Sequence, residues 1–570
     1  MDRLVTAPFD PSRYIGSVCH VRPVTVEVNL PLASSQAGFN YAGYTVPGGQ
    51  VGEFVVIEGE EHAVLGRIVE VRLPERERLF VEPTAETEGD PNPVGVVQLL
   101  TAIDLRSGAT LKGIPTHPRI GQHIFSAHPL LIKQAVENDS SGEDRKVQLA
   151  VFPHAQDTFV SMRPAHLFGR HAAVLGATGG GKSWTVARIV EEIARLGGKA
   201  ILFDATGEFS AQANSVRHVY LGGVPSSQED TRRYVSFPFN HLTESDLFVL
   251  FRPSGASQAP KLREAIRSLK VAHVEPALAP DGLVRKANSS KAPFERALRQ
   301  HAVALKADGA EFDISCLPDQ IAEECVWANG RGVAGAGSWG NQNETELGYC
   351  TGLVARIEAD IQSPFMACVY QPAGLEPLPR VIGAFLESPD ERILRVSLEH
   401  LPFEHNTREL VTNAVGRYLL RLARDDRFRR QPLVVVLDEA HQFLNKSLGD
   451  EYTRVQLESF GLIAKEGRKY FLTCVLATQR PRDIPEDVLS QMGMFIVHRL
   501  INERDRQVVE RACGNLDASA ASFLPTLAQG EALLVGVDSP MPLPVLIRRP
   551  RFEPRSHGPD YDAFWPECLA

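Results

Sequence analysis

The sequence predicts an α/β fold in which a parallel β-sheet is covered by helices on both faces. Two runs, LVVVL at 433–437 and LTCVLAT at 472–478, are apolar throughout and have the length of strands. Strands that are buried on both faces of a parallel sheet have this continuous apolar character. Segments with helical spacing alternate with such runs, as is typical of an α/β core. The full prediction adds a small β-barrel before the core and a helical insertion within it.

Residues 1–135 are predicted to form the β-barrel. Turn-rich stretches such as VPGGQVG and EGDPNPVG separate short runs of strand-forming residues. Closure into a barrel leaves no exposed edge strand. A polar stretch at 137–146, ENDSSGEDRK, is then expected to be a surface loop or linker. The predicted strands are VTVEVNL (24–30), EFVVIEG (53–59), VLGRIVEVRL (64–73) and GVVQLLTAIDL (95–105).

The α/β core is expected in two parts, at 150–238 and 393–550. Residues 239–392 between them are predicted to form a mainly helical insertion, which glycine-rich stretches such as NGRGVAGAGSWGNQ interrupt. Residues 551–570 are expected to be a C-terminal tail. The candidate helices of the insertion are TESDLFVLFRP (243–253), APKLREAIRSLK (259–270), APFERALRQHAVALKA (292–307) and TELGYCTGLVARIEADI (345–361).

The composition is that of a soluble protein with several domains. The chain has 570 residues, of which 43% are hydrophobic and 23% charged. No apolar run reaches the roughly 18 residues of a membrane-spanning helix, and the N-terminus lacks the pattern of a secretory signal. The eight cysteines show no CxxC or zinc-type spacing, and Cys474 is expected to be a small buried hydrophobe. We therefore expect a cytoplasmic protein with no membrane partner and no metal cluster.

The net charge of −10 limits how the chain can bind DNA. A protein that covers DNA with its outer surface is normally basic, so the acidic total counts against that mode. A ring that threads DNA needs positive charge only along its bore, and the total charge is compatible with that arrangement.

The segment Gly176–Ser183, GATGGGKS, matches the phosphate-binding pattern GxxxxGK[ST]. It lies between the apolar run HAAVL and the segment SWTVARIVEEIARLGG, whose apolar residues have helical spacing. Glycines let backbone N–H groups point inward at phosphates, and the helix N-terminus adds partial positive charge. We expect Lys182 to contact the β- and γ-phosphates of ATP and the Ser183 hydroxyl to bind Mg²⁺. The alternative is a glycine-rich turn that carries Lys-Ser by chance. The predicted nucleotide-binding residues are Gly176, Ala177, Thr178, Gly179, Gly180, Gly181, Lys182, Ser183 and Trp184.

Two adjacent carboxylates, Asp438 and Glu439, directly follow the run LVVVL. Burying neighbouring charges is costly unless a cation or a reaction requires them. Asp438 is suited to hold Mg²⁺ through its water shell, and Glu439 is suited to polarise the attacking water. The alternative is an exposed acidic cap of a helix.

Polar residues follow two further strand-like runs. Asp204 and Glu208 come after KAILF, and either is placed to act near the γ-phosphate or to line the nucleotide pocket. A role for Asp204 in capping a turn is the alternative. Gln479, after the run at 472–478, stands where ring-forming ATPases have a γ-phosphate sensor. Its alternative role is to stabilise the turn beside Pro481.

Basic residues precede two of the predicted strands. Arg170 comes before HAAVL, and Lys465, Arg468 and Lys469 come before the run at 472–478. An arginine that reaches the γ-phosphate of a neighbouring subunit contributes about 10³–10⁵ in rate. Arg170 and Arg468 are the candidates for this role, and a solvated basic patch is the alternative.

Three arginines share one face of a predicted helix because they are spaced at i, i+4 and i+7. They are expected either to line a bore that contains DNA or to pair with acids at the surface, such as Asp425. The three residues are Arg417, Arg421 and Arg424.

Five motifs together, LGATGGGKS, DATGEF, VVVLDEAHQFL, KEGRKY and LATQRP, resemble those of the HerA-type ATPases within the HerA/FtsK translocase group. The stretch VGEFVVIEGEEHAVLGRIVEV resembles their HAS-barrel, and GEALLVGVDSPMPLPVLIRRPRF resembles their C-terminal segment, which braces neighbouring subunits. The resemblance covers about 15–550, and it implies a RecA-like ATPase core. One motif departs from the family, which commonly has a histidine where this chain has Thr206.

The resemblance implies a homohexameric ring that hydrolyses ATP between subunits and translocates on double-stranded DNA. Family members usually work with a nuclease partner, NurA, and some bacterial relatives pair with other effectors in anti-phage defence. Carried over by position, Lys182 and Ser183 bind the nucleotide and Mg²⁺, Asp438 holds the metal, Glu439 is the catalytic carboxylate, Gln479 is the sensor, and Arg170 and Arg468 are the arginine candidates.

Two functions remain open on this basis. The first is an ATP-driven DNA translocase or helicase that feeds or activates a separate nuclease or effector, since no nuclease-like cluster is present apart from the ATPase residues. The second is an ATPase scaffold that assembles and gates a partner enzyme, with the β-rich N-terminal part as the docking surface.

Overall fold

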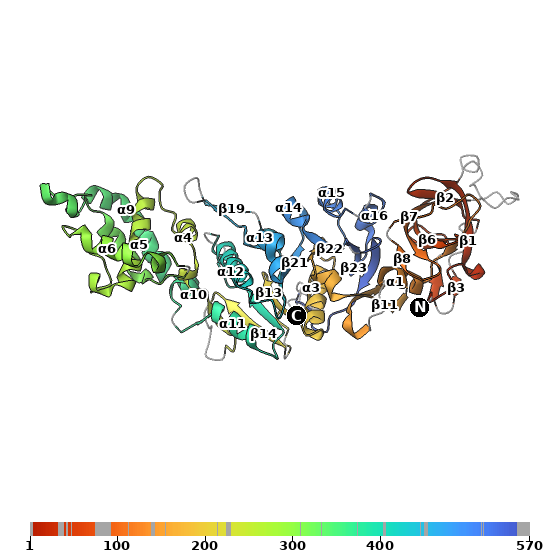
Figure 1. Ribbon diagram of the computed structural model, residues 1–570, viewed down its shortest axis with the longest axis horizontal. Helices are drawn as coiled ribbons and strands as arrows, with labels where there is room; N and C mark the ends of the chain where they lie inside the picture. Colours follow the sequence, from red (N-terminus) through yellow and green to blue (C-terminus); the bar gives the residue numbers. More distant parts are fainter. Residues whose placement is uncertain are drawn as a thin grey trace, which may run out of the picture. The chain divides into compact units, whose positions relative to one another are not determined.

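The chain, shown as a computed structural model in Figure 1, divides into two compact units. The first consists of Met1–Leu196 and Val475–Glu553, and the second of Gly197–Cys474 and Pro554–Ala570. The structure describes residues 4–555 except 32–38, 42–43, 47, 74–92, 112, 138–142, 154, 212, 214, 224–229, 308, 332, 373, 403–405, 445, 450–453, 515, 517 and 538.

The N-terminal part of the first unit is a closed antiparallel barrel of six strands. Its strand order is β2-β1-β9-β5-β6-β7, and pairing of β2 with β7 closes it. Valine and isoleucine side chains such as Val26, Ile68 and Val97 fill the interior. The predicted barrel is therefore confirmed. Its strands are β1 (Tyr14–Val21), β2 (Thr25–Asn29), β5 (Phe54–Ile57), β6 (His62–Arg72), β7 (Val94–Asp104) and β9 (His123–Ser126), with β8 (Thr110–Leu111) added to β7 and β3 (Phe39–Tyr41) and β4 (Tyr44–Val46) forming a separate hairpin.

The rest of the first unit contains a mixed sheet with the order β11-β10-β24-β23-β22-β12-β21. Strand β12 runs parallel to both β21 and β22, as predicted for a parallel sheet. Strands β23 and β24 differ from that prediction, because a short connection at 537–542 joins them and only antiparallel neighbours can be joined so tightly. The strands are β10 (Val147–Phe152), β11 (Ala155–Met162), β12 (His171–Leu175), β21 (Leu472–Thr478), β22 (Met492–Val497), β23 (Glu531–Gly536) and β24 (Leu543–Ile547).

The helices of the first unit are mostly short, and the longest follows the predicted phosphate loop. This helix, α3 (Lys182–Arg195), has buried Val186, Ile189 and Ile193 on one face, so the predicted helical spacing reflects burial. The other helices are α1 (Pro129–Glu137), α2 (Pro164–Phe168), α14 (Glu486–Leu489), α15 (Glu503–Ala512) and α16 (Ala518–Ser522), with 3₁₀ turns at Pro11–Arg13, Glu143–Arg145, Pro481–Asp483 and Leu524–Thr526.

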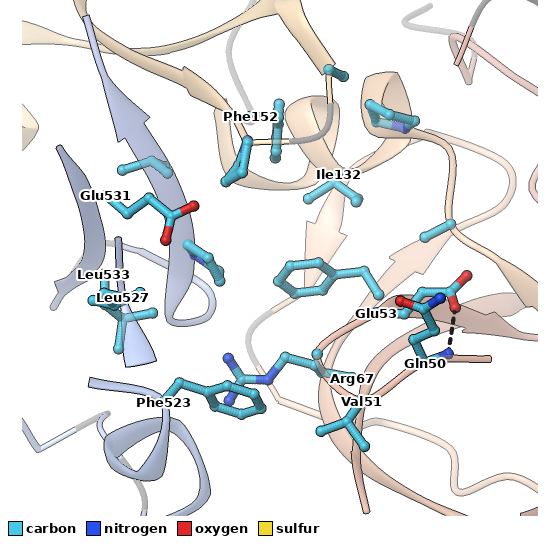
Figure 2. Close-up of a pocket in the computed structure, with 18 of the residues that line it drawn as sticks. Gln50, Val51, Glu53, Arg67, Ile132, Phe152, Phe523, Leu527, Glu531 and Leu533 are labelled. Carbon is cyan, nitrogen blue, oxygen red and sulfur yellow. Dashed lines mark hydrogen bonds between the residues drawn. The ribbon is translucent and has the colours of Figure 1, made fainter. Parts of the chain in front are cut away.

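Barrel and sheet of the first unit border a cavity of about 280 Å³ (Figure 2). Arg67 of β6 lies over the ring of Phe523, which precedes the turn Leu524–Thr526, with 4.9 Å from the guanidinium carbon to the ring centre. Glu531, at the start of β23, lines the same cavity. Five residues between 523 and 531 therefore line the cavity next to the barrel: Phe523, Leu524, Thr526, Leu527 and Glu531.

The second unit is built on a parallel sheet with the order β18-β13-β17-β14-β15-β16. Every residue of β13, β17 and β18 is buried, as expected for a parallel sheet covered on both faces. Of the three, only β18 is apolar throughout, since β13 ends in Asp204 and β17 contains Arg395. The strands are β13 (Lys199–Asp204), β14 (Val216–Leu221), β15 (Tyr234–Ser236), β16 (Glu376–Pro377), β17 (Ile393–Ser397) and β18 (Leu433–Leu437), with a small hairpin of β19 (Ser447–Leu448) and β20 (Val455–Gln456).

Helices α11 (Leu378–Glu387), α12 (Thr407–Arg424) and α13 (Ser459–Glu466) accompany this sheet. The ring of Phe460 in α13 packs against that of Phe203 in β13, with 5.7 Å between the ring centres. The 3₁₀ turns here are Phe239–His241, Ala440–Gln442 and Gly467–Tyr470.

The segment between the two parts of this sheet is mainly helical, as predicted. Thr243 begins its first helix with a capping box that includes Asp246. The predicted helix at 292–307 is broken at His301 into two shorter helices. The helices are α4 (Glu244–Phe251), α5 (Gln258–Val274), α6 (Lys291–Gln300), α7 (Ala302–Lys306), α8 (Leu317–Glu324), α9 (Glu344–Gln362) and α10 (Ala367–Tyr370), of which α5, α6 and α9 lie side by side (Figure 1), with 3₁₀ turns at Pro276–Leu278, Ile314–Cys316, Val333–Gly337 and Pro364–Met366.

The predicted α/β class with a barrel and a helical segment is confirmed, whereas the predicted domain boundaries remain predictions. Part of the predicted linker, 138–142, and the tail from 556 onward lie outside the described residues. Within the described residues, no helix combines the length and the apolar character needed to cross a membrane.

Candidate active site

The predicted phosphate loop connects the buried strand β12 to helix α3. Gly179 and Gly181 have φ values of +75° and +112°, which only glycine adopts without strain. Gly181 is also the N-cap of α3. The N–H groups of Gly179, Gly181 and Ser183 find no acceptor among the residues that the structure describes. A set of unpaired N–H groups at a helix N-terminus fits the phosphates of a nucleotide.

Three backbone hydrogen bonds fix the start of this loop. The Gly176 N–H donates to the carbonyl of Thr478 at 3.3 Å, and the Ala177 N–H donates to that of Arg499 at 3.0 Å. Within the loop, the Gly180 N–H donates to the Ala177 carbonyl at 3.1 Å. The loop is therefore held between the ends of β21 and β22.

The side chains predicted to bind nucleotide differ in exposure. Lys182 is 7% exposed, in the first turn of α3, while Thr178 is exposed and Ser183 is half-buried. Trp184 is half-buried, and the guanidinium carbon of Arg549 lies 5.4 Å from the centre of its ring. The nucleotide contact assigned to Trp184 remains a prediction.

Gln479 lies beside the phosphate loop. The Thr178 hydroxyl donates a hydrogen bond to its side-chain oxygen. This contact places an amide from the end of β21 next to the loop, which is the location that a γ-phosphate sensor requires. The sensor role itself remains a prediction.

Asp438 and Glu439 follow β18 in the second unit and are 4% and 6% exposed. The Asp438 N–H donates to the Phe203 carbonyl at 3.2 Å, so Asp438 continues the pairing of β18 with β13. Glu439 has left-handed backbone angles, φ 47° and ψ 46°. Nδ1 of His441 lies 3.2 Å from its carboxylate. The burial of both acids argues against the exposed helix cap.

The structure favours a structural role for Asp204. Its carboxylate accepts hydrogen bonds from the N–H groups of Gly207, Glu208 and Phe209 at 2.8, 3.2 and 3.0 Å. Arg395 of β17 donates to the same carboxylate through Nε at 2.7 Å. A carboxylate with four such donors is saturated and has little capacity left for a metal.

The candidate arginines lie at strand starts. Arg170 is half-buried before β12, and a Cβ on Gly493 would come within 2.4 Å of its side chain. Arg468 is exposed before β21. Each arginine therefore lies at the start of its strand, whereas the phosphate loop and Gln479 lie at the ends of β12 and β21. The action of Arg170 or Arg468 on a neighbouring subunit stays a prediction.

Two arginines of the stripe on α12 are paired with acids. Arg417 forms an ion pair with the buried Asp246, and Arg424 lies 3.0 Å from Glu466. These contacts match the surface-pairing alternative rather than a free positive face.

The first unit thus brings the phosphate loop together with Gln479, and the second brings Asp438 together with Glu439. Among the described residues, no cluster of three or more His, Cys, Asp or Glu side chains is arranged to hold a metal ion. The Ser183 hydroxyl and the Asp438 carboxylate are the hard oxygen donors that Mg²⁺ prefers. Sequence reasoning missed His498, which packs under the phosphate loop, although its position directly after the apolar run MGMFIV was a usable indication.

Comparison with known proteins identifies similar chains. Residues 152–304 match the family model for the central domain of the helicase HerA. The DNA double-strand break repair helicase HerA of Pyrococcus furiosus is 23% identical over 443 residues, covering 75% of this chain and 73% of the relative. The protein of the same name from Saccharolobus solfataricus is 25% identical over 405 residues, covering 69% of this chain and 67% of the relative. Among solved structures, VirB4 of Thermoanaerobacter pseudethanolicus aligns with a TM-score of 0.45 and 15% identity, covering 73% of this chain and 99% of that one.

These matches confirm the resemblance to the HerA-type ATPases that the motifs indicated. The chain is an ATP-hydrolysing enzyme with a P-loop core.

Proposed function

We propose that this chain is an ATP-driven translocase or helicase on double-stranded DNA, which works as a homohexamer with a separate nuclease or effector protein. The observation that carries the proposal is the phosphate loop, whose unpaired N–H groups at the start of α3 fit a nucleotide triphosphate. The relatives in Pyrococcus and Saccharolobus are named as DNA double-strand break repair helicases, which supports DNA as the substrate.

The proposed chemistry is transfer of the γ-phosphoryl group of ATP to water. Lys182 contacts the β- and γ-phosphates and neutralises the charge that develops on them. Glu439 orients the attacking water and accepts its proton, so the products are ADP and inorganic phosphate. Ser183 and Asp438 would hold Mg²⁺, which would neutralise phosphate charge when bound. Gln479 contacts the γ-phosphate. The loss of this contact after hydrolysis is transmitted to the loop after β21.

The proposal requires that the phosphate loop of the first unit and the carboxylates of the second act on one nucleotide. Three variants of the full chain test it in an assay for phosphate release with linear duplex DNA. Lys182→Ala is expected to lose ATP binding, whereas Glu439→Gln should bind ATP normally and hydrolyse it at least about 100-fold more slowly. Lys306→Ala changes an exposed lysine at the end of α7 and should leave the rate unchanged. Normal hydrolysis by either site variant would refute the proposed site.

The same Glu439→Gln variant separates a translocase from a scaffold. A translocase that cannot hydrolyse ATP stops displacing a roadblock from duplex DNA. A scaffold still assembles with its partner and activates it. The proposal is wrong about translocation if the variant complex, purified from the native host with its partner, processes DNA like the wild-type complex.

A further inference from the structure

Beyond the proposed nucleotide-contacting residues, the phosphate loop packs against a buried histidine, His498. His498 directly follows β22, and its backbone N–H donates at 2.7 Å to the carbonyl of Leu175, the last residue of β12. Its side chain is fully buried. A burial of this kind costs free energy unless the polar ring atoms are hydrogen-bonded.

Both ring nitrogens of His498 have partners, and these partners fix its tautomer. Nδ1 lies 2.8 Å from the carbonyl oxygen of Glu531, which can only accept, so Nδ1 carries the proton. Nε2 then has a lone pair and accepts a hydrogen bond from the Thr185 hydroxyl at 2.7 Å. Burial, reinforced by the positive charge of Lys182, lowers the pKa of His498 to about 4 and keeps the ring neutral near pH 7.

Three glycines of the phosphate loop lie close to the side chain of His498. A Cβ on Gly176 would lie 2.6 Å from Cβ of His498, and one on Gly180 would lie 3.4 Å from the same atom. A Cβ on Gly181 would lie 3.3 Å from Cε1 of His498. The loop therefore packs closely against the His498 side chain, at its Cβ and at one edge of its ring.

The same region ties the loop to β23. The N–H of Gly530 donates to the Gly180 carbonyl at 3.2 Å, and the next residue, Glu531, accepts from His498. Thr185 completes the connection, because it lies one turn into α3 and its N–H donates to the Gly181 carbonyl at 3.0 Å. The imidazole thus joins β23 to the first turn of the phosphate-binding helix.

We propose that His498, acting through Thr185 and the Glu531 carbonyl, is a positioning residue that holds the phosphate loop in its nucleotide-binding shape. The inference rests on the proposed nucleotide site. His498 touches the loop from the inner side, so it acts on nucleotide affinity through the loop rather than by contact with the phosphates.

Equilibrium titration of the full chain with a fluorescent ADP analogue tests this role. Thr185→Val removes the hydroxyl but keeps the shape of the side chain, and is expected to weaken binding by roughly three- to tenfold, the effect of one lost hydrogen bond. Thr158→Val, a matched change at another buried threonine of the first unit, is expected to bind like the wild type. The thermal midpoints of the two nucleotide-free variants should be similar.

Variants of His498 add a test by partial rescue. His498→Leu removes both hydrogen bonds and is expected to weaken binding more than tenfold, whereas His498→Asn retains a donor for the Glu531 carbonyl and should recover part of the loss. Adding Thr185→Val to His498→Leu should cause a smaller loss than Thr185→Val causes in the wild type, because the hydrogen bond to the imidazole is already absent and only the longer contact of the hydroxyl with the Gly181 carbonyl, at 3.2 Å, remains to be lost. A purely structural role predicts normal affinity for every variant that folds.

Controls with the wild type and Lys182→Ala separate the two proposals. If the wild type binds the analogue and Lys182→Ala does not, normal affinity of Thr185→Val would overturn the role of His498 while the nucleotide site stands. Because Thr185→Val is close to isosteric, this outcome decides the question even if His498→Leu fails to fold. If the wild type itself shows no binding, the nucleotide site is refuted, and the role of His498 falls with it.

Discussion

At the scale of single residues, Glu439 has a backbone conformation that costs free energy. Its φ of 47° lies in the left-handed region, which residues with a side chain occupy at a cost of roughly 1–3 kcal/mol. Glycine at this position would relieve the strain but would remove the carboxylate. The side chain is buried and contacts His441. Strained backbone of this kind clusters at active sites. The strain at Glu439 therefore supports a role for its buried carboxylate in the chemistry.

His498 makes stability depend on pH in a defined direction. Its pKa is about 4 in the folded chain and ordinarily 6.5, so below pH 6.5 the unfolded chain binds a proton that the folded chain does not. Stability therefore falls as the pH decreases from 6.5 towards 4. Between pH 7 and 4.5 the wild type is expected to lose roughly 2 kcal/mol more unfolding free energy than His498→Asn. Urea unfolding at both pH values measures this difference, and identical losses would contradict it.

At the scale of elements, the buried ion pair between Asp204 and Arg395 joins β13 to β17. Both side chains are almost fully buried, and the pair belongs to adjacent parallel strands. Arg395→Ala would leave the carboxylate without its cation, at a cost of about 3 kcal/mol or more in unfolding free energy. Arg429→Ala, which removes an exposed partner of Asp426, should cost less than about 1 kcal/mol. Chemical denaturation measures both, and similar stabilities for the two variants would show that the pair is not important.

The elements also show why some roles were predictable from sequence and others were not. The phosphate loop depends on neighbours in sequence, because strand, glycines and helix follow one another within 171–195, and this order of elements was predicted. The structural role of Asp204 depends on Arg395, which is distant in sequence, so both roles stayed open. The antiparallel strand β23 looks like any apolar run. His498 was missed because its two partners, Thr185 and Glu531, come together only in the folded unit.

At the scale of the whole molecule, the charges bear on how DNA would be held. The net charge is −10, and two arginines of the α12 stripe are paired with acids of the second unit. Neither fact supports DNA binding along this helix. Positive charge on the bore of a ring would therefore have to come from other residues.

The proposed ring also predicts that subunits with different defects complement one another. If Arg468 acts on the nucleotide of its neighbour, a ring with Lys182→Ala and Arg468→Ala subunits contains interfaces at which an intact phosphate loop meets an intact arginine. Random assembly of equal amounts makes about a quarter of the interfaces complete, because each of the two requirements is met half the time. Rings co-expressed in this ratio should hydrolyse ATP at about a quarter of the wild-type rate, while either variant alone is nearly inactive.

A matched pair distinguishes action across an interface from simple dilution of defects. If Lys182 and Glu439 of the same chain serve one nucleotide, every subunit of a ring with Lys182→Ala and Glu439→Gln keeps one defect in its own site. Co-expression of these two should therefore restore no activity. Recovery by this pair would place the carboxylate in the neighbouring subunit, and failure of the first pair would exclude Arg468 as the residue that acts across the interface. Arg170→Ala can then be tested in its place, because a heterologous interface presents each arginine to one neighbour only.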